Sequence, residues 1–155
     1  MRKITLSNIT FWVGTTLAVF TLGALLLGYR GVIVVGQSMA PTLTNKSIQL
    51  TSLVDEDYAP QHDDIICFFP FGEFNDDTLF VKRIIGVEGD VLQAQEGVLM
   101  RNGSIVCSHP GIGTWSAEVP TGTVFVLGDH YYRSTDSRIL GAIPLENIYS
   151  KICTK

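Results

Sequence analysis

Cysteine and histidine are both scarce in this sequence. The 155 residues include three cysteines and three histidines, and no two cysteines have the Cys-x-x-Cys spacing typical of zinc sites. We therefore expect neither a metal site nor a bound cofactor. The odd cysteine count leaves at least one thiol without a partner inside the chain; the cysteines are Cys67, Cys107 and Cys153.

Positive charge is also in short supply. The chain has 11 Lys and Arg residues against 15 Asp and Glu residues, which gives a formal net charge of −4. Proteins that bind nucleic acid usually carry a basic patch, so we expect no nucleic-acid partner. Internal repeats and low-complexity segments are missing too, and the length predicts one folded domain.

Charged residues are missing altogether from the run Ile4–Tyr29. About 20 consecutive apolar residues are enough to cross a bilayer as a helix, so this run predicts one N-terminal transmembrane helix. Arg2 and Lys3 precede the run, and the positive-inside rule then places the chain after Arg30 on the outer side of the membrane.

Two other interpretations of the run stay open: a cleaved secretory signal and a buried core helix. The run is longer than the usual apolar core of a signal, and no clear Ala-x-Ala site follows it, which favours an uncleaved anchor. The chain then divides into a membrane anchor with a short cytoplasmic end over residues 1–30 and a folded domain over residues 31–155.

The folded domain is rich in short β-branched and apolar runs separated by turn residues, a pattern typical of strands. Asn102-Gly103 between two apolar runs is a strong signal for a hairpin turn. We therefore predict a mainly β, antiparallel domain with little helix. The expected strands cover residues 31–35, 48–54, 65–69, 78–87, 91–94 and 123–127 and the two arms of a hairpin over 98–106. Loops are expected over residues 70–77 and 109–119, and residues 139–148 are expected to close the domain.

Ser38 is the first candidate for chemistry. It lies where the strand over residues 31–35 gives way to a turn marked by Pro41. A serine hydroxyl is a poor nucleophile at neutral pH and needs a base to take its proton. Most serines are ordinary surface groups, so Ser38 becomes a candidate only through a partner elsewhere in the chain.

Lys82 is one candidate for that base. It stands in an apolar segment, and burial disfavours the charged ammonium and lowers its pKa. A lysine that loses its proton near neutral pH can act as a general base. The alternative is an ordinary strand lysine that faces water, with Arg83 on the opposite face. The apolar neighbours of Lys82 are Phe80, Val81, Ile84 and Ile85.

His130 is the other candidate. A Ser-His-Asp triad would combine Ser38 and His130 with Asp129 or Asp136. Nothing in the sequence places His130 beside Ser38. On the residues alone, the choice between a lysine base and a histidine base stays open.

Several segments in order resemble the conserved boxes of the type I signal peptidases, the membrane-anchored serine-lysine peptidases. The resemblance implies a compact, antiparallel, β-barrel-like catalytic domain that follows an N-terminal transmembrane helix. Residues 37–43 are similar to the nucleophile box, 64–66 to the short strand before the base, 80–90 to the lysine box, and 128–138 with Gly141 to the last box.

The resemblance also implies roles for individual residues. Ser38 attacks the scissile carbonyl, its backbone N–H donates to the oxyanion, and Lys82 takes the hydroxyl proton. Ser134 holds the lysine amine through a hydrogen bond, while Asp136 and Arg138 form a supporting ion pair. The remaining implied residues are Gly128 and Asp129 as support, and Met39, Gln37 and Pro41 as substrate-binding residues, with Met39 on the floor of a shallow pocket.

The function implied is that of a membrane-bound serine endopeptidase of signal peptidase I type. Its partners would be preproteins with Ala-x-Ala-like cleavage sites and the lipid bilayer. The implied location is the inner (cytoplasmic) membrane, single-pass, with the catalytic domain on the outer or periplasmic side; the mitochondrial inner membrane stays open. Two alternatives are a maturation peptidase for one pilus or conjugation-type substrate, and a catalytically silent anchored β-domain that binds signal helices.

Three positions depart from the family pattern. Gly36 stands where some relatives carry a serine whose hydroxyl helps the oxyanion. His130 replaces the usual asparagine of the last box, and Tyr131 replaces a frequent arginine. Lys82 argues against the endoplasmic-reticulum type, which uses a histidine base.

Overall fold

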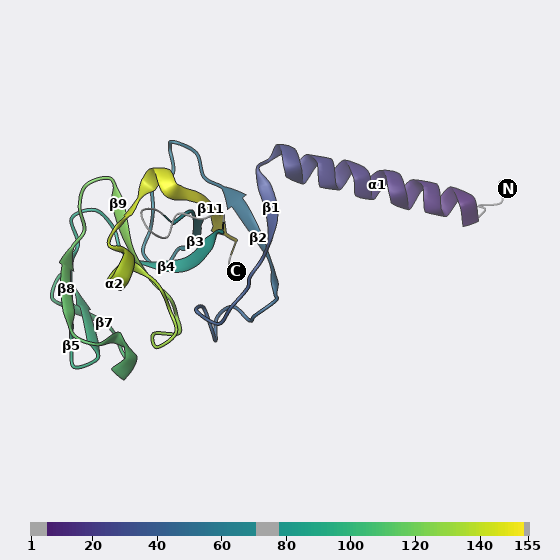
Figure 1. The fold of residues 1–155 in the computed structure, drawn as a ribbon. Helices are drawn as coiled ribbons and strands as arrows, with labels where there is room; N and C mark the ends of the chain where they lie inside the picture. Colours follow the sequence, from purple (N-terminus) through teal and green to yellow (C-terminus); the bar gives the residue numbers. More distant parts are fainter. Residues whose placement is uncertain (1–5, 71–77, 154–155) are drawn as a thin grey trace.

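An N-terminal helix leads into a β-rich body (Figure 1). The computed structural model describes residues 6–70 and 78–153. The helix α1 (Leu6–Leu26) extends away from the strands, and it is followed directly by β1 (Tyr29–Ile33). Arg2, Lys3 and most of the loop expected over 70–77 lie outside the described residues.

The helix does not confirm the expected membrane span. Within the described part of the chain, no helix has both the length and the apolar character needed to cross a bilayer. The described side chains of α1 are nevertheless exposed and largely apolar; the largest are Phe11, Trp12, Val13, Leu17, Val19, Phe20, Leu22, Leu25 and Leu26.

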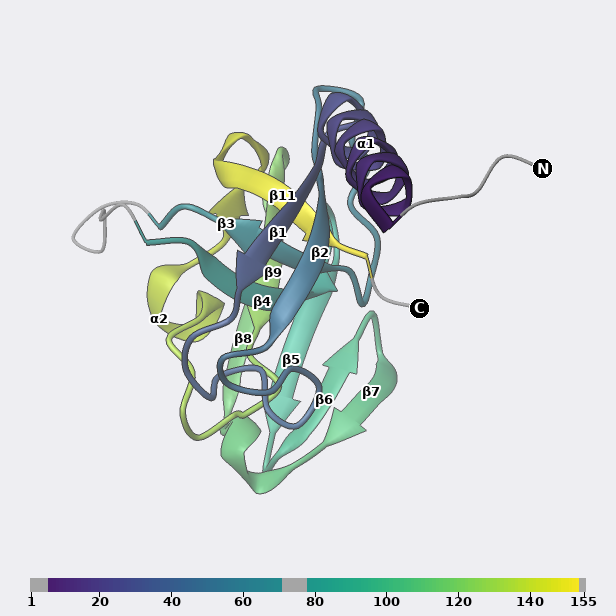
Figure 2. The ribbon, with the colours of Figure 1, turned by 90° about the vertical axis from the view of Figure 1, so that its right-hand side faces the viewer.

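The strands of residues 6–70 and 78–153 form two sheets, and every recorded strand pair is antiparallel (Figure 2). The prediction of a mainly β, antiparallel fold is thus confirmed. The seven-stranded sheet has the order β1, β2 (Ile48–Leu53), β11 (Ile148–Ile152), β3 (Ile65–Phe68), β4 (Phe80–Gly86), β9 (Thr123–Leu127) and β10 (Ile143–Pro144). The four-stranded sheet has the order β7 (Ser104–Ser108), β6 (Val98–Arg101), β5 (Val91–Gln95) and β8 (Trp115–Glu118).

The central strand β3 packs against a different apolar cluster on each face. Successive side chains of a strand point to opposite faces of the sheet. All four residues of β3 are buried because both faces are covered. Ile66 and Phe68 join a cluster with residues of β4 and β9. Ile65 and Cys67 join a second cluster that contains Met39 and Leu43 from the turn after β1. Cys67 is accordingly a buried apolar residue, as expected.

Two predicted segments differ from the structure. The segment 109–119, expected to be a loop, contains a short 3₁₀ helix, η2 (Pro110–Ile112), and the strand β8. The closing segment does not end the fold, because the strand β11 follows it and lies between β2 and β3. The closing segment itself contains the second half of the short helix α2 (Ser137–Leu140), then β10 and η3 (Leu145–Asn147).

The hairpin turn lies where the sequence places it. Asn102 and Gly103 have φ angles of 52° and 79°, the left-handed conformation that a tight two-residue hairpin turn requires. This turn connects β6 to β7.

Candidate active site

The turn after β1 presents Ser38 at the edge of the seven-stranded sheet. The apolar side chain of Met39 is 1% exposed and fixes the turn on the cluster that also contains Ile65. The Ser38 carbonyl accepts a hydrogen bond of 2.9 Å from the His130 backbone, and the Gly36 N–H donates to Asn45 Oδ1 at 3.0 Å. These contacts fix the position of the Ser38 backbone, and the Ser38 hydroxyl faces a groove.

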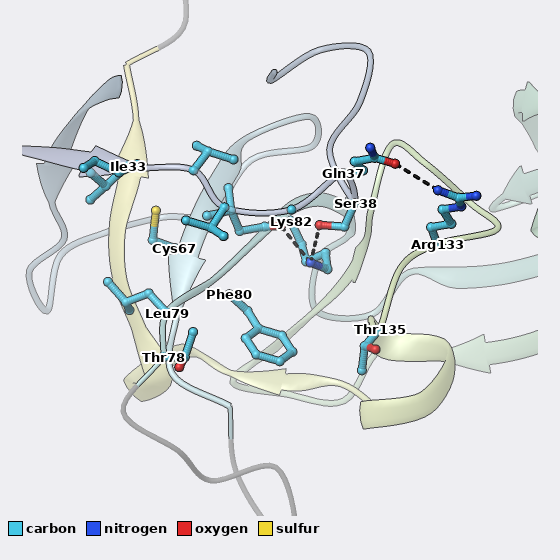
Figure 3. Close-up of a pocket in the computed structure, with 15 residues that line it drawn as sticks. Ile33, Gln37, Ser38, Cys67, Thr78, Leu79, Phe80, Lys82, Arg133 and Thr135 are labelled. Atoms are coloured by element: carbon cyan, nitrogen blue, oxygen red, sulfur yellow. Dashed lines mark hydrogen bonds between the residues drawn. The ribbon is translucent and has the colours of Figure 1, made fainter. Parts of the chain in front are cut away.

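Lys82 of β4 reaches this hydroxyl. Its Nζ donates to Ser38 Oγ at 3.0 Å and to the Val81 carbonyl at 2.9 Å (Figure 3). The residue is 4% exposed, and burial lowers the pKa of its amine to about 8, against a smaller opposing effect of the Asp136 charge. With that pKa, roughly a tenth of the amines are neutral at pH 7. A neutral amine next to a hydroxyl can accept its proton.

Arg83, the next residue of β4, fixes the last box to the sheet from the other face. Its Nε and Nη2 donate to the two carboxylate oxygens of Asp129 at 2.9 and 2.8 Å. Such bidentate pairs set orientation as well as distance. The sequence indicated Arg83 only as the residue on the face of the strand opposite Lys82. Its place in the segment that resembles the lysine box was the signal that could have suggested a structural role.

Gly128 allows the last box to lie against the nucleophile. A Cβ at this position would overlap Ser134 Oγ and lie 2.6 Å from the Ser38 carbonyl oxygen. The Gly128 N–H donates to Asp136 Oδ2 at 3.0 Å. A side chain at residue 128 would therefore displace both the nucleophile turn and the segment after β9.

Asp136 and Arg138 form a largely buried ion pair behind this segment. Asp136 is fully buried, and Arg138 donates to it from Nε at 2.9 Å and from Nη2 at 2.9 Å. Arg138 also donates to the backbone carbonyls of Gly111 and Tyr131, at 2.9 and 2.8 Å. It therefore connects the last box to the 3₁₀ helix η2 before β8.

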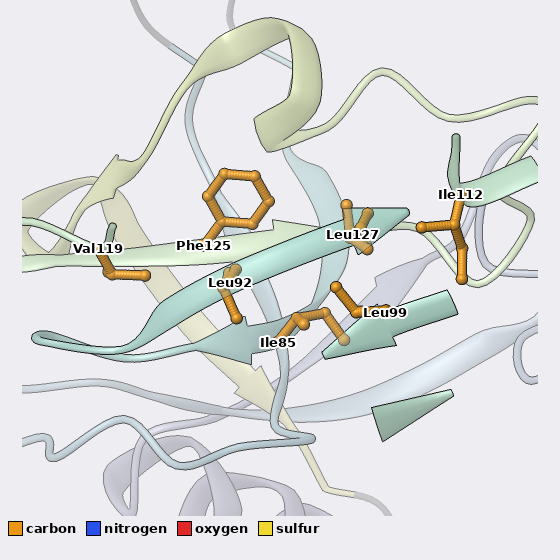
Figure 4. Close-up of a cluster of buried hydrophobic side chains, with 8 residues drawn as sticks. Ile85, Leu92, Leu99, Ile112, Val119, Phe125 and Leu127 are labelled. Atoms are coloured by element: carbon orange, nitrogen blue, oxygen red, sulfur yellow. The ribbon is translucent and has the colours of Figure 1, made fainter. Parts of the chain in front are cut away.

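The core between the two sheets supports the same connection. Phe125 and Leu127 of β9 lie just before Gly128 and pack with residues of β5 and β6 (Figure 4). Ile112 of η2 belongs to this cluster as well. The position of the last box thus depends on the packing of the second sheet against β9.

The hydrogen bond predicted between Ser134 and Lys82 is absent. Ser134 Oγ is buried and has no hydrogen-bond partner within the described residues. The Lys82 amine is directed instead to Ser38 Oγ and the Val81 carbonyl, while Ser134 lies against Gly128.

The histidine alternative finds no support in the geometry. The His130 backbone contacts Ser38, but its ring atom Nδ1 is buried without a partner in the described part of the protein. The two carboxylates that could orient the ring are paired with arginines: Asp129 with Arg83 and Asp136 with Arg138.

A groove of about 560 Å³ runs past Ser38 and Lys82. Of the residues expected to bind substrate, Gln37 lines the groove, Met39 is buried beneath the turn, and Pro41 is exposed outside the lining. The rest of the lining consists of residues for which no substrate contact was expected from the sequence: Val32, Ile33, Val34, Val35, Gly36, Cys67, Thr78, Leu79, Phe80, Val81, Arg133 and Thr135. No cluster of metal-binding side chains occurs among the residues whose placement is described.

Comparisons with known proteins agree with this arrangement. A family model described as signal peptidase, peptidase S26, matches residues 6–154. The chain is 30% identical over 122 residues to a probable signal peptidase I-1 of Synechocystis, covering 72% of this chain and 62% of that protein. It is 29% identical over 145 residues to signal peptidase I of Bacillus caldolyticus, covering 80% of this chain and 77% of that protein.

A solved structure shows the same likeness. The crystal structure of a signal peptidase I from Enterococcus faecalis matches with a TM-score of 0.55 at 25% identity, covering 63% of this chain and 98% of that chain. The present chain spans 62% of the length of the cyanobacterial relative. Because the family model extends over nearly all of the sequence, the chain belongs to the signal peptidase family, peptidase S26.

Proposed function

We propose that this protein is a serine endopeptidase of signal peptidase I type, which removes N-terminal signal peptides from preproteins. One observation carries the proposal: the buried Lys82 amine lies 3.0 Å from Ser38 Oγ. Burial lowers the pKa of that amine to about 8, so it can supply the base that a serine nucleophile needs.

The reaction follows from this pair. Neutral Lys82 takes the proton of Ser38 Oγ while the oxygen attacks the scissile carbonyl carbon. The Ser38 backbone N–H donates to the resulting oxyanion, and a single such donor is worth roughly 3–4 kcal/mol in the clearest case. The Lys82 ammonium then gives its proton to the leaving amine, and an acyl ester on Ser38 remains. Water, activated by the neutral amine, hydrolyses this ester and restores both residues.

The neighbouring ion pairs hold this geometry. Arg83 with Asp129 and Arg138 with Asp136 fix the last box to the sheet, and Gly128 lets it approach the Ser38 carbonyl. We assign to these residues the positioning of the dyad and no direct contact with substrate.

The groove fits an extended peptide with small apolar side chains before the scissile bond. Its walls on one side of Ser38 are apolar, from the residues after β1 and from Leu79 and Phe80. A substrate with alanine at the positions one and three residues before the cleaved bond matches such a surface. We therefore propose preproteins with Ala-x-Ala sites as the substrate class.

We also propose that the N-terminal segment attaches the enzyme to the cytoplasmic membrane as a single-pass anchor, with the catalytic domain on the outer side. The uncharged run Ile4–Tyr29 and the exposed apolar side chains of α1 support the proposal. Attachment would confine enzyme and substrate to one surface and raise their effective concentration. The mitochondrial inner membrane would serve equally well.

The test uses the full chain in detergent and a preprotein with an Ala-x-Ala site. Ser38→Ala and Lys82→Ala should each abolish cleavage, whereas His130→Ala should retain measurable turnover. Ser104→Ala, an exposed serine of β7, is the matched control and should cleave like the parent protein. Activity that survives loss of Ser38 or Lys82 would refute the dyad. A parent protein that binds the preprotein without cleaving it would instead favour the silent β-domain.

A further inference from the structure

Arg133 is the one groove residue whose charge the chemistry above does not use. It lines the groove, and its Nη1 donates to the neutral Gln37 Oε1 at 3.0 Å. Gln37 is the residue next to the nucleophile, so the guanidinium is fixed close to Ser38. No carboxylate of residues 6–70 or 78–153 forms an ion pair with Arg133.

The two other arginines near this site each have a carboxylate partner. Arg83 is paired with Asp129, and Arg138 with Asp136. An arginine retains its charge at any pH in which the protein is folded. The Lys82 amine, the other basic group in the groove lining, is directed to Ser38 Oγ and the Val81 carbonyl. Arg133 therefore leaves a positive charge at one end of the groove, away from the Lys82 amine.

The position of Arg133 indicates which part of the substrate would lie near its charge. In Figure 3, Ile33 and Leu79 lie on one side of Ser38, and Arg133 lies on the other. The scissile carbonyl must sit at Ser38 Oγ, so a peptide whose small apolar residues occupy the Ile33 side continues toward Arg133 with the residues after the cut. Those residues become the N-terminus of the released protein.

We infer that Arg133 is a specificity-determining residue that favours substrates with a carboxylate side chain within the first residues after the cleaved bond. The inference rests on the proposed function. The guanidinium would bind an aspartate or glutamate of the leaving segment, while Gln37 keeps it in place. A lysine or arginine at the same substrate position would be repelled.

The expected preference is modest, because the site is open to water. An exposed ion pair at about 4 Å contributes about a fivefold difference in a binding or rate constant. The preference should shrink as salt is raised, since about 0.15 M salt already screens exposed charges beyond about 8 Å.

The experiment compares three preproteins that share one Ala-x-Ala site and carry glutamate, glutamine or lysine at the second residue after the cut. The full chain in neutral detergent should cleave the glutamate substrate about fivefold faster, by kcat/KM, than the glutamine substrate, and the lysine substrate slowest. Arg133→Lys keeps the charge and should keep the order. Arg133→Gln keeps an amide donor for Gln37 but removes the charge, and it should bring the three rates together.

The control is Lys46→Asn, which removes an exposed charge outside the groove at a position with φ 63°, a conformation that asparagine tolerates. It should preserve the order of the three substrates. Equal cleavage of all three by the parent protein, or an equal loss on all three with Arg133→Gln, would overturn the inference and leave the peptidase intact. No cleavage of any substrate by the parent protein would refute the proposed function itself.

Discussion

Replacing Lys82 with methionine should abolish catalysis and at the same time change how stability depends on pH. The pKa of a lysine in the unfolded chain is near 10.5, and burial lowers it to about 8 in the folded protein. Between these values the unfolded chain binds a proton that the folded protein does not. The free energy of unfolding therefore rises with pH through this window, and the burial of Lys82 costs most stability below pH 8.

The magnitude follows from the two pKa values. Each unit of difference corresponds to about 1.4 kcal/mol, so the full effect is about 3.5 kcal/mol, of which about 2.5 kcal/mol should appear between pH 7 and pH 10. Lys82→Met has no group to titrate there. The difference in unfolding free energy, parent minus variant, should increase by that amount over this range, because contributions from the other titrating groups cancel.

Urea unfolding in detergent at several pH values measures this difference. Trp115 stacks on Phe125 in the core between the sheets and reports on the β-domain by fluorescence. Ser38→Ala is the control: it is inactive but keeps the amine, so it should show the same pH dependence as the parent protein. A difference between parent and Lys82→Met that stays flat from pH 7 to pH 10 would refute a buried amine with a lowered pKa.

Three further predictions concern the same site. The kcat/KM of the parent protein should rise with pH to a plateau with an inflection near pH 8, since only the neutral Lys82 amine accepts a proton; a rate that falls over this range would contradict a lysine base. Asp136→Asn should cost about 3 kcal/mol in urea unfolding, because it removes the carboxylate partner of the largely buried Arg138. It should also move the inflection to lower pH, because the Asp136 charge raises the pKa of Lys82; an unchanged inflection would count against this coupling. Gly128→Ala should lower the unfolding free energy by about 1–3 kcal/mol and reduce kcat, because its Cβ would lie 2.6 Å from the Ser38 carbonyl oxygen; parent-like values would show that the turn moves freely.

Local signals predicted much of the sheet. The strands β2, β3, β5 and β9 lie within about two residues of their predicted ends, because each combines β-branched residues with flanking turn residues. The strand β8 was missed because it is short and polar: two of its four residues are Ser116 and Glu118, and both are exposed. Its pairing with β5, which lies far from it in sequence, supplies the stability that its own composition does not suggest.

In the site, too, features set by neighbouring residues could be predicted from the sequence, and contacts between distant residues could not. The apolar neighbours of Lys82 were visible in the sequence and made a buried amine with a lowered pKa one of two open interpretations; the fold buries the residue. The direction of the amine was not visible, because it depends on how the turn after β1 lies over β4. For the same reason the bond expected from Ser134 was wrong, whereas the contact of Arg83 with Asp129, 46 residues away, could not be read from local pattern.

The place of β11 in the sheet determines when the proposed active site can form during folding. β11 pairs with β2 on one side and β3 on the other, although it follows every other described strand in the chain. Until residues 148–152 emerge, β2 and β3 have unpaired edges and the sheet that carries Lys82 stays incomplete. A nascent or partly exported chain should therefore be unable to cut the polypeptides around it, and peptidase activity should appear only when the last strand has been inserted.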